Sequence, residues 1–292
     1  MSQTPSPSRS DRDAERLVWF NRDGWVGWQT PRLRAGRVRW VRLVLAERWP
    51  SEAVNRRERS VAYRVEPAPA RRIADELYVK HTREPLLRGL LRLGRPQSWR
   101  VARIGRAMRE AGIGVPTVWF AGSRLSRPWL EHAVVLAGVD GVSLRALRRS
   151  IGRGEAYDRA VVRAAEAAAH LHACGFGHGD FVPGNVLLGP ASDGRERSVT
   201  FIDNDRTRRV LGPWRLRARC RNTAQMAHRL RLLGRWADAR TLLRAYASAS
   251  GLPSAAMRRV RRAAVRRARR DFGLDKARGL RQEMDGGPIY RG

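Results

Sequence analysis

One short segment of the chain carries the residue types that phosphoryl transfer requires. His178-Gly179-Asp180-Phe181-Val182-Pro183-Gly184-Asn185 places a carboxylate and a carboxamide five positions apart, and a second carboxylate, Asp203, follows a β-branched run. In kinase-like loops one Asp accepts the proton of the attacking hydroxyl, while an Asn and a further Asp hold Mg²⁺. The pattern therefore predicts a phosphotransferase with Asp180 as the base and with Asn185 and Asp203 as metal ligands. The competing interpretation is a surface Asx turn, which would not explain the helix-like segment before the loop or the strand-like ones after it.

Lys80 is the next candidate for a functional role. The chain has 59 basic residues, of which only Lys80 and Lys276 are lysines, and Lys80 lies in the strand-like run 77–82. A compact ammonium fits between the α- and β-phosphates of a nucleotide in a way that a forked guanidinium does not. We therefore expect Lys80 to bind nucleotide phosphate. The alternative is a lysine on an edge strand with no such role.

Two further polar residues flank the predicted metal ligands. We expect the ring of His178 to hold the loop through hydrogen bonds rather than to bind a metal. Asp205 lies two residues after Asp203 and next to Arg206. It either supports the metal shell or pairs with that arginine, and the sequence leaves both roles open.

The elements that must position these residues divide into two groups. Strand-like alternation and one helix come first, and helical periodicity dominates after a glycine-bounded hinge near residue 138. The expected strands are 61–65, 77–82, 115–121, 132–136, 186–188 and 199–202, and the expected helices are 98–111, 156–174 and most of the chain after 223. This order predicts an α+β fold of two lobes, with a small β-rich N-lobe and a helical C-lobe.

The same reasoning predicts the domain limits. Residues 1–14 are a disordered tail on composition, 15–138 form the N-terminal lobe, 139–275 form the helical lobe with the catalytic loop, and 276–292 are a flexible tail. The N-terminus has no apolar segment of a signal peptide, and no apolar run approaches the roughly 20 residues that cross a bilayer. Two cysteines make neither a disulfide framework nor a metal site. A cytoplasmic protein is therefore expected.

The charge is strongly positive. Lys+Arg 59 against Asp+Glu 27 gives a net charge of +32. Such a surface attracts polyanions such as nucleic acid or anionic lipid, although an arginine-favouring composition would produce the same total. The arginine-dense segment 258–270 accordingly has two interpretations, which are docking to an anionic lipid or phosphorylated sugar and a solvated helix face.

Several motifs together resemble one known family. Tyr78-Val79-Lys80, the segment from Leu171 to Phe181, Pro183 to Leu188, and Ile202 to Arg206 are similar to the lipopolysaccharide kinase family, which includes the Kdo and core heptose kinases. The resemblance spans roughly residues 60 to 270. It implies a protein-kinase-like fold, ATP and Mg²⁺ as cofactors, and phosphorylation of an inner-core sugar on a lipid A precursor. It also implies an anionic glycolipid or phosphosugar acceptor and a peripheral place on the cytoplasmic face of the inner membrane, reached through the arginine-rich surface.

The chain departs from the wider kinase pattern at three places. No glycine-rich loop joins the first two predicted strands, where Pro67 and Pro69 stand instead. No glutamate lies between Glu84 and Glu110, so Glu110 is the remaining candidate for the helix partner of Lys80. Gly179 replaces the arginine that reads a phosphorylated activation loop, so we expect no such switch.

The sequence also allows other functions. A small-molecule kinase resembling aminoglycoside or choline phosphotransferases shares the His-Gly-Asp loop, although a protein at +32 would not attract a cationic substrate. A non-catalytic kinase-like scaffold would leave the intact set of polar residues unexplained. An arginine-rich RNA-binding protein has only charge in its favour, so no specific nucleic-acid partner is expected.

Overall fold

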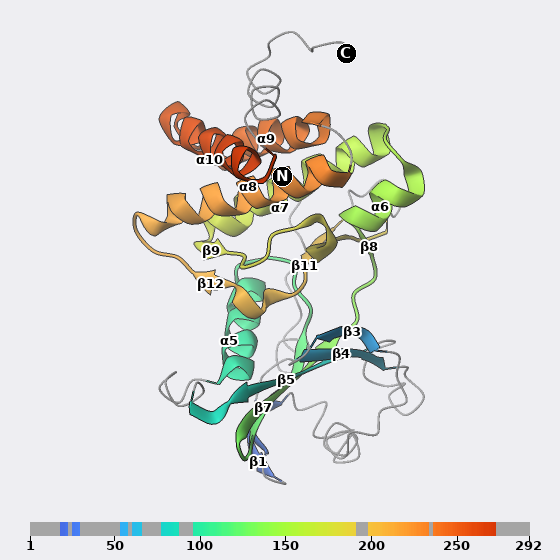
Figure 1. Ribbon diagram of the computed structural model, residues 1–292, viewed down its shortest axis with the longest axis vertical. Coiled ribbons are helices and arrows are strands. Elements are labelled where there is room, and N and C mark those ends of the chain that lie inside the picture. The colour runs from blue at the N-terminus through green and yellow to red at the C-terminus, as the bar shows by residue number, and fades with distance from the viewer. Residues whose placement is uncertain are drawn as a thin grey trace. The chain divides into compact units, whose positions relative to one another are not determined.

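The computed structural model describes residues 18–22, 25–29, 53–57, 60–65, 77–87, 96–190, 198–233 and 236–272 (Figure 1). The predicted tails, 1–14 and 276–292, lie outside these ranges. The chain forms two compact units, one of Met1–Ala107 with Pro116–Val139 and one of Met108–Val115 with Asp140–Gly292. The first unit contains an antiparallel sheet and the second is mainly helical, which confirms the α+β fold class expected from the sequence.

A seven-stranded antiparallel sheet forms the centre of the first unit, in the order β1-β2-β6-β7-β5-β4-β3. Its strands are β1 (Val18–Arg22), β2 (Trp25–Gln29), β3 (Ala53–Arg57), β4 (Ser60–Val65), β5 (Leu77–Pro85), β6 (Val118–Ser126) and β7 (Trp129–Ala137). The last four match predicted strands, whereas β1 to β3 were not predicted. Arg57 of β3 pairs with Ser60 of β4, so β4 is preceded by a strand that the sequence did not reveal. The predicted turn with Pro67 and Pro69 falls between β4 and β5, outside the described residues.

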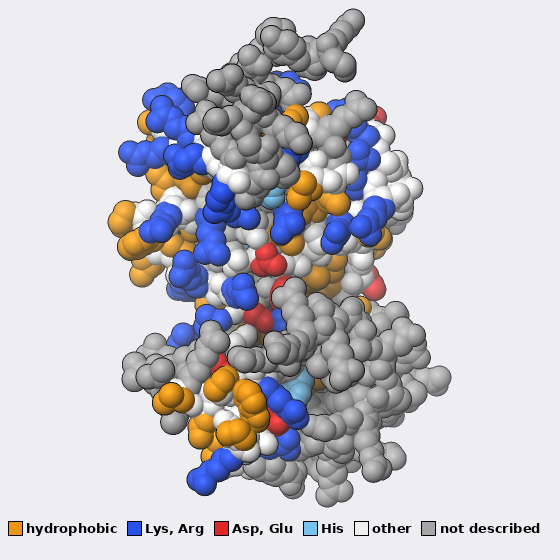
Figure 2. All heavy atoms as spheres, in the orientation of Figure 1, with side chains coloured by type: hydrophobic (Ala, Val, Ile, Leu, Met, Phe, Trp, Pro, Cys, Tyr) orange, Lys and Arg blue, Asp and Glu red, His pale blue; other side chains and the backbone are white. Residues whose placement is uncertain are grey.

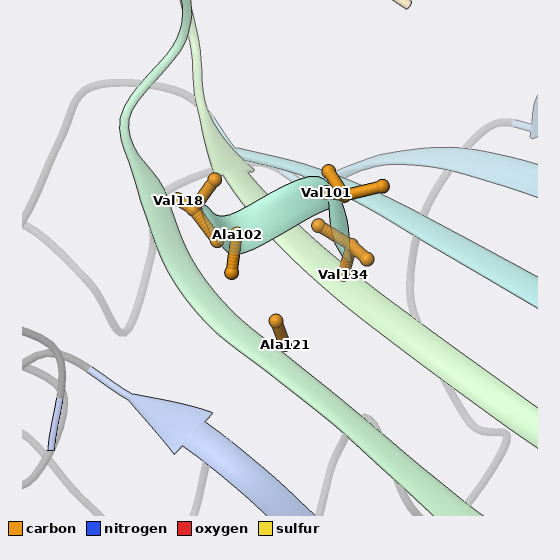
Figure 3. Packing of buried hydrophobic residues seen from close by; sticks show 5 residues of the cluster. All are labelled: Val101, Ala102, Val118, Ala121 and Val134. Carbon is orange, nitrogen blue, oxygen red and sulfur yellow. The ribbon is translucent and has the colours of Figure 1, made fainter. Parts of the chain in front are cut away.

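One helix, α5 (Gln97–Glu110), packs its apolar side against this sheet. Val101 and Ala102 of the helix form a buried cluster with residues of β6 and β7 (Figure 3). The strand members of that cluster are Val118, Ala121 and Val134. Lys80 on β5 lies directly opposite Val134 on β7. Because directly paired residues of an antiparallel ladder project from the same face, Lys80 shares the face of the sheet that α5 covers.

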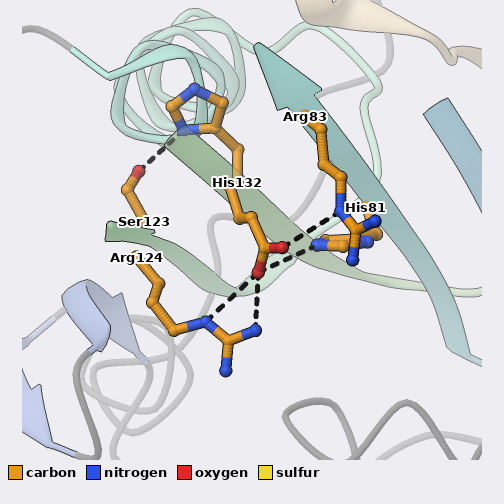
Figure 4. A network of polar contacts seen from close by, with 6 residues as sticks. His81, Arg83, Ser123, Arg124 and His132 are labelled. Atoms are coloured by element: carbon orange, nitrogen blue, oxygen red, sulfur yellow. Dashed lines mark hydrogen bonds and ion pairs between the residues drawn. The ribbon is translucent and has the colours of Figure 1, made fainter. Parts of the chain in front are cut away.

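β7 presents two different polar clusters on its two faces, as the close-up in Figure 4 shows. His132 lies in a buried chain in which Glu84 Oε1 is 2.7 Å from His132 Nε2, and Ser123 Oγ is 2.8 Å from both His132 Nδ1 and Ser98 Oγ. Its neighbour Glu131, 2% exposed, pairs with guanidinium groups from the two flanking strands. Those guanidinium groups belong to Arg83 at 3.0 Å and Arg124 at 2.6 Å. Burial alone would raise the pKa of Glu131, but the hydrogen bond and charge of Arg124, with the charges of His81 and Arg83, lower it.

The described part of the second unit is built from helices around two small sheets, β11-β10-β8 and β12-β9. Its helices are α6 (Leu144–Ile151), α7 (Glu155–Ala173), α8 (Trp214–Leu233), α9 (Trp236–Ser250) and α10 (Ser254–Phe272), and its short elements are β8 (Val142–Ser143), β9 (Phe176–Gly177), η1 (Pro183–Asn185), β10 (Val186–Leu188), β11 (Val199–Phe201), η2 (Asn204–Arg206) and β12 (Arg208–Arg209). α7 packs on α9, and α8 packs on both α9 and α10. α8 begins at Trp214, nine residues before the predicted helical region. No helix in the described part of the chain has the length and apolar character to cross a bilayer.

The buried polar chain of the first unit generates a stability prediction. Glu84→Ala removes the partner of His132 Nε2 at a site where the ring is 1% exposed. Leaving a buried polar group unpaired costs about 1–3 kcal/mol. We therefore expect a loss of that size in the free energy of unfolding, measured by urea denaturation. The control Glu155→Ala breaks an exposed i,i+4 pair and should change it by less than about 0.5 kcal/mol. Equal losses in the two variants would show that the buried chain contributes no specific stability.

Candidate functional site

The second unit brings together five of the predicted site residues. The loop that follows β9 carries His178 and Asp180, and η1 carries Asn185. Asn185 Nδ2 donates a 2.9 Å hydrogen bond to the backbone oxygen of Asp180. The backbone N–H of Ile202 donates to the backbone oxygen of Asn185 at 3.0 Å, one residue before Asp203. Direct hydrogen bonds therefore connect the segments that hold the three predicted catalytic and metal-binding residues.

His178 joins the same two segments through its ring. Nδ1 accepts a hydrogen bond from the backbone N–H of Asp180 at 3.1 Å, so the proton is on Nε2, which donates to the backbone oxygen of Ile202 at 3.0 Å. Burial lowers the pKa of His178 below its ordinary value, even though the bond to Ile202 and the charges of Asp203 and Asp180 act in the opposite direction. The ring is therefore neutral near pH 7, with both nitrogens engaged in the loop.

Asp203 has an unusual backbone conformation. Its φ of 58° and ψ of 48° lie in the left-handed region, and among the described residues no other non-glycine has a positive φ. Aspartate tolerates this region better than most residues, but the conformation still has a cost and is enriched at functional sites. The turn is fixed by Asn204, whose Nδ2 donates to the backbone oxygen of Phe201 at 2.8 Å and whose Oδ1 accepts from Thr207 at 3.2 Å. The exposed Asp203 side chain therefore projects from a hydrogen-bonded bend, and Asp205 follows it, half-buried, in η2.

Gly179 has a steric reason to be glycine. A Cβ at this position would lie 2.0 Å from the Cβ of Arg206 and 2.7 Å from its backbone carbon and oxygen. The segment after Asp203 thus passes directly over the loop beside Asp180. An arginine could not occupy position 179 without displacing that segment, which gives a physical basis for this departure from the kinase pattern.

A buried asparagine on α8 holds the loop backbone. Asn222, 1% exposed, accepts a hydrogen bond from the backbone N–H of His178 at 3.0 Å and donates one to the backbone oxygen of the same residue at 2.6 Å. His172 on α7 donates from Nε2 to Asn222 Oδ1 at 3.0 Å, because the amide nitrogen of Asn222 already faces His178. Tyr246 on α9 then donates to His172 Nδ1 at 2.9 Å. Burial lowers the pKa of His172 to about 4. Three helices are thus connected to one loop residue.

Gln225, one helical turn further along α8, contacts the candidate base itself. Its Nε2 donates to Asp180 Oδ1 at 2.6 Å, and its Oε1 accepts from the backbone N–H of Phe181 at 3.2 Å. Gln225 therefore fixes one oxygen of the carboxylate and the peptide that follows it. Sequence reasoning identified neither Gln225 nor Asn222, because each lies more than 40 positions from the loop residues that it contacts and neither has a motif of its own.

The donor set fits a hard divalent cation. The hydrogen bond from Asn185 uses the amide nitrogen, which leaves Oδ1 as the oxygen that a cation would use, and Asp203 supplies a carboxylate. Mg²⁺ prefers such oxygen ligands and completes its shell with waters and substrate phosphates. The described residues contain no group of three or more His, Cys, Asp and Glu side chains placed to hold a metal. Any Mg²⁺ bound here would therefore take its remaining ligands from water and phosphate oxygens.

The two remaining predicted site residues, Lys80 and Glu110, belong to different units. Lys80 is on β5, on the face that α5 covers. Glu110 is exposed at the C-terminal end of α5, eight residues after Ala102, which corresponds to about 12 Å along the helix axis. No other acidic residue occurs in α5. The helix turns that pack on the sheet around Val134 therefore carry no carboxylate.

Comparison with known proteins connects this geometry to a family. The model of the lipopolysaccharide kinase (Kdo/WaaP) family matches residues 44–246. Among solved structures, WaaP in complex with acyl carrier protein superposes with a TM-score of 0.54 at 20% identity, over 94% of this chain and 100% of that one. At this identity the likeness shows a shared fold. No curated protein matches the chain.

Removing the Gln225 side chain tests its effect on Asp180. A hydrogen bond to a charged group contributes about 1.5–3 kcal/mol, so Gln225→Ala should lower kcat for phosphoryl transfer by roughly 10- to 100-fold. Nucleotide KM should change little, because the contact is to the loop carboxylate. Steady-state kinetics give both constants. Arg229→Ala, an exposed change on the same helix, is the matched control. A Gln225→Ala enzyme with the kcat of this control would exclude a positioning role.

The buried His172 predicts how stability depends on pH. Its pKa is about 4 in the folded protein and about 6.5 when unfolded, so the unfolded state binds the proton first as pH falls. The contribution of the neutral His172 ring to the free energy of unfolding is fully present above pH 6.5. It decreases by about 3 kcal/mol between about pH 6.5 and pH 4. Unfolding free energies measured across this range should fall in the wild type, and the slope should be smaller in His172→Gln. A wild-type slope retained in the variant would assign the pH dependence to other groups.

Proposed function

The chain belongs to the lipopolysaccharide kinase (Kdo/WaaP) family, whose members are kinases, and we propose that it transfers phosphate from ATP to a sugar hydroxyl of the lipopolysaccharide inner core. The acceptor sugar is Kdo or heptose on a lipid A precursor. The observation that carries the proposal is the hydrogen-bonded assembly of Asp180, Asn185 and the Asp203 segment in one unit. A purely structural turn would require neither the left-handed backbone of Asp203 nor the hydrogen bond from Gln225 to the Asp180 carboxylate.

The proposed roles follow from the chemistry of each side chain. Asp180 accepts the proton of the attacking sugar hydroxyl while the hydroxyl oxygen bonds to the γ-phosphorus of ATP. The bond between the γ-phosphorus and the β–γ bridging oxygen breaks, and ADP leaves. Asn185 and Asp203 would hold Mg²⁺, which neutralises phosphate charge when bound. Lys80 would bind the α- and β-phosphates. His178 remains neutral and keeps the Asp180 peptide aligned with the end of β11.

An anionic acceptor suits this protein better than a cationic one. The sequence carries 59 basic and 27 acidic residues, so its average field repels aminoglycosides and choline and attracts phosphorylated glycolipids. We propose that the enzyme meets its acceptor at the cytoplasmic face of the inner membrane as a peripheral protein. The arginine-rich surface of the helical unit would provide the contact (Figure 2).

The direct test is transfer of labelled γ-phosphate from Mg·ATP to Kdo–lipid A, to a heptosylated acceptor and to an aminoglycoside panel. We expect label on an inner-core acceptor, and Asp180→Asn should reduce the rate by about 10²- to 10⁴-fold because it removes the general base. Asp203→Asn should also weaken nucleotide binding in a Mg²⁺-dependent manner. Asp140→Asn, an exposed change of the same type, serves as the control.

Two outcomes would contradict the proposal. Label on aminoglycosides alone would make the chain a small-molecule kinase. Equal transfer by wild type and Asp180→Asn would remove the loop from the chemistry, and the assignment of Asp180 as the base would be wrong.

A further inference from the structure

The connection between β12 and α8 exposes two large apolar side chains. Leu211 is 76% exposed and Trp214 is 59% exposed, with Gly212 and Pro213 between them. Among the described residues these are the two most exposed large hydrophobic side chains of the helical unit. Leu211, Gly212, Pro213 and Trp214 are referred to below as the docking tip. In Figure 1 this connection projects at the left edge of the helical unit, and Figure 2 shows apolar and basic side chains together at that edge.

The docking tip has a well-anchored base. Val210, immediately before it, is 7% exposed and its backbone N–H donates to the backbone oxygen of Gly175 at 2.7 Å. Gly212 has a φ of +54°, which lets the chain turn, and the N–H of Arg215 donates to its backbone oxygen at 3.1 Å. The Arg215 side chain bonds the backbone oxygen of Ala173 at the end of α7, at 2.5 Å. The fold therefore holds Leu211 and Trp214 outward although burying them would be favourable.

The sequence on both sides of the docking tip carries charge of one sign. No acidic residue occurs between Asp205 and Asp238, while seven arginines lie between positions 206 and 221. The exposed members of this set are Arg206, Arg208, Arg209, Arg215, Arg217 and Arg221. The guanidinium of Arg217 lies over the ring of Trp214, 5.2 Å from its centroid. The docking tip and the exposed arginines next to it in the sequence thus form one surface.

We propose that the docking tip inserts into an anionic lipid bilayer and that the surrounding arginines bind lipid phosphates. Tryptophan and leucine on a turn are suited to the boundary between headgroups and acyl chains, where an aromatic ring can lie with one end in hydrocarbon. Arginines near an anionic membrane surface each add about fivefold to the binding constant. A bilayer offers both hydrocarbon and many phosphates on one plane, which matches the composition of this surface.

This membrane-docking proposal extends the proposed function and rests on it. Arg206, five residues before Leu211, packs against Gly179 beside the candidate base. β12 also pairs with β9, the strand that leads into the catalytic loop. A short, hydrogen-bonded segment therefore connects a membrane-bound docking tip to the loop that carries Asp180.

The test is co-sedimentation of the full chain, without nucleotide, with phosphatidylglycerol–phosphatidylethanolamine vesicles and with neutral phosphatidylcholine vesicles. We expect binding to the anionic vesicles, and Leu211→Ser with Trp214→Ser should weaken it by about 100-fold, since burying each side chain is worth at least about tenfold. Ile151→Ser with Leu232→Ser, which removes two other half-exposed apolar side chains, should leave binding unchanged. Quenching of tryptophan fluorescence by brominated acyl chains should occur in the wild type and be greatly reduced in Trp214→Phe.

A second comparison separates a specific surface from general charge. Arg208→Ser with Arg217→Ser should weaken vesicle binding by about 25-fold, and Arg258→Ser with Arg262→Ser on α10 should have a much smaller effect. Equal losses from the two arginine pairs, no effect of the docking-tip variant, or binding of an acidic acyl carrier protein instead of vesicles would each overturn the proposal. Phosphate transfer to a deacylated, soluble acceptor should be the same in wild type and docking-tip variant. If neither protein transfers phosphate but the wild type still binds anionic vesicles, the result would count against the proposed function alone.

Discussion

The carboxamide of Asn222 is the interaction on which the candidate site depends most. It satisfies both backbone groups of His178 from inside the protein, and its oxygen also accepts from His172. A buried amide left unpaired costs about 1–3 kcal/mol, so the loop cannot shift unless several buried groups lose partners together. Hydrogen bonds of Asn222 thus connect the loop, the end of α7 and the middle of α8. Asp180 lies in that loop, and Gln225 on α8 fixes its carboxylate.

The local part of the site could be predicted from the sequence, whereas its supports could not. Asp180 and Asn185 are five residues apart, and the bond between them stays within one loop, so spacing alone was informative. Asn222 and Gln225 are three residues apart on α8, which places them on one face of the helix. Nothing in the sequence identifies the loop as their partner, because that depends on how three helices pack. The left-handed conformation of Asp203 could not be predicted from the sequence either, since aspartate adopts it only where the surroundings impose it.

The strands show the same division between local and distant causes. β5 and β7 have apolar residues in strand-like runs bounded by turns, and both were predicted. β2 was not, because Trp25, Val26, Gly27 and Trp28 give no alternation of apolar and polar residues. Its glycine is explained only by the neighbouring strand, since a Cβ there would lie 2.1 Å from the backbone oxygen of Ala121. The family model nevertheless begins at residue 44, so β3 falls within the matched region and β1 and β2 extend the sheet beyond it.

We propose that the loop, its supports and the basic docking surface serve a kinase that modifies a sugar attached to a lipid. The measurement that tests this claim most directly is tandem mass spectrometry of the product formed from Mg·ATP and an inner-core glycolipid. The account predicts one added phosphate on a hydroxyl of Kdo or heptose, and none on the lipid A glucosamines. A phosphate found only on the glucosamines or on the protein, or unmodified glycolipid after ATP is consumed, would contradict it.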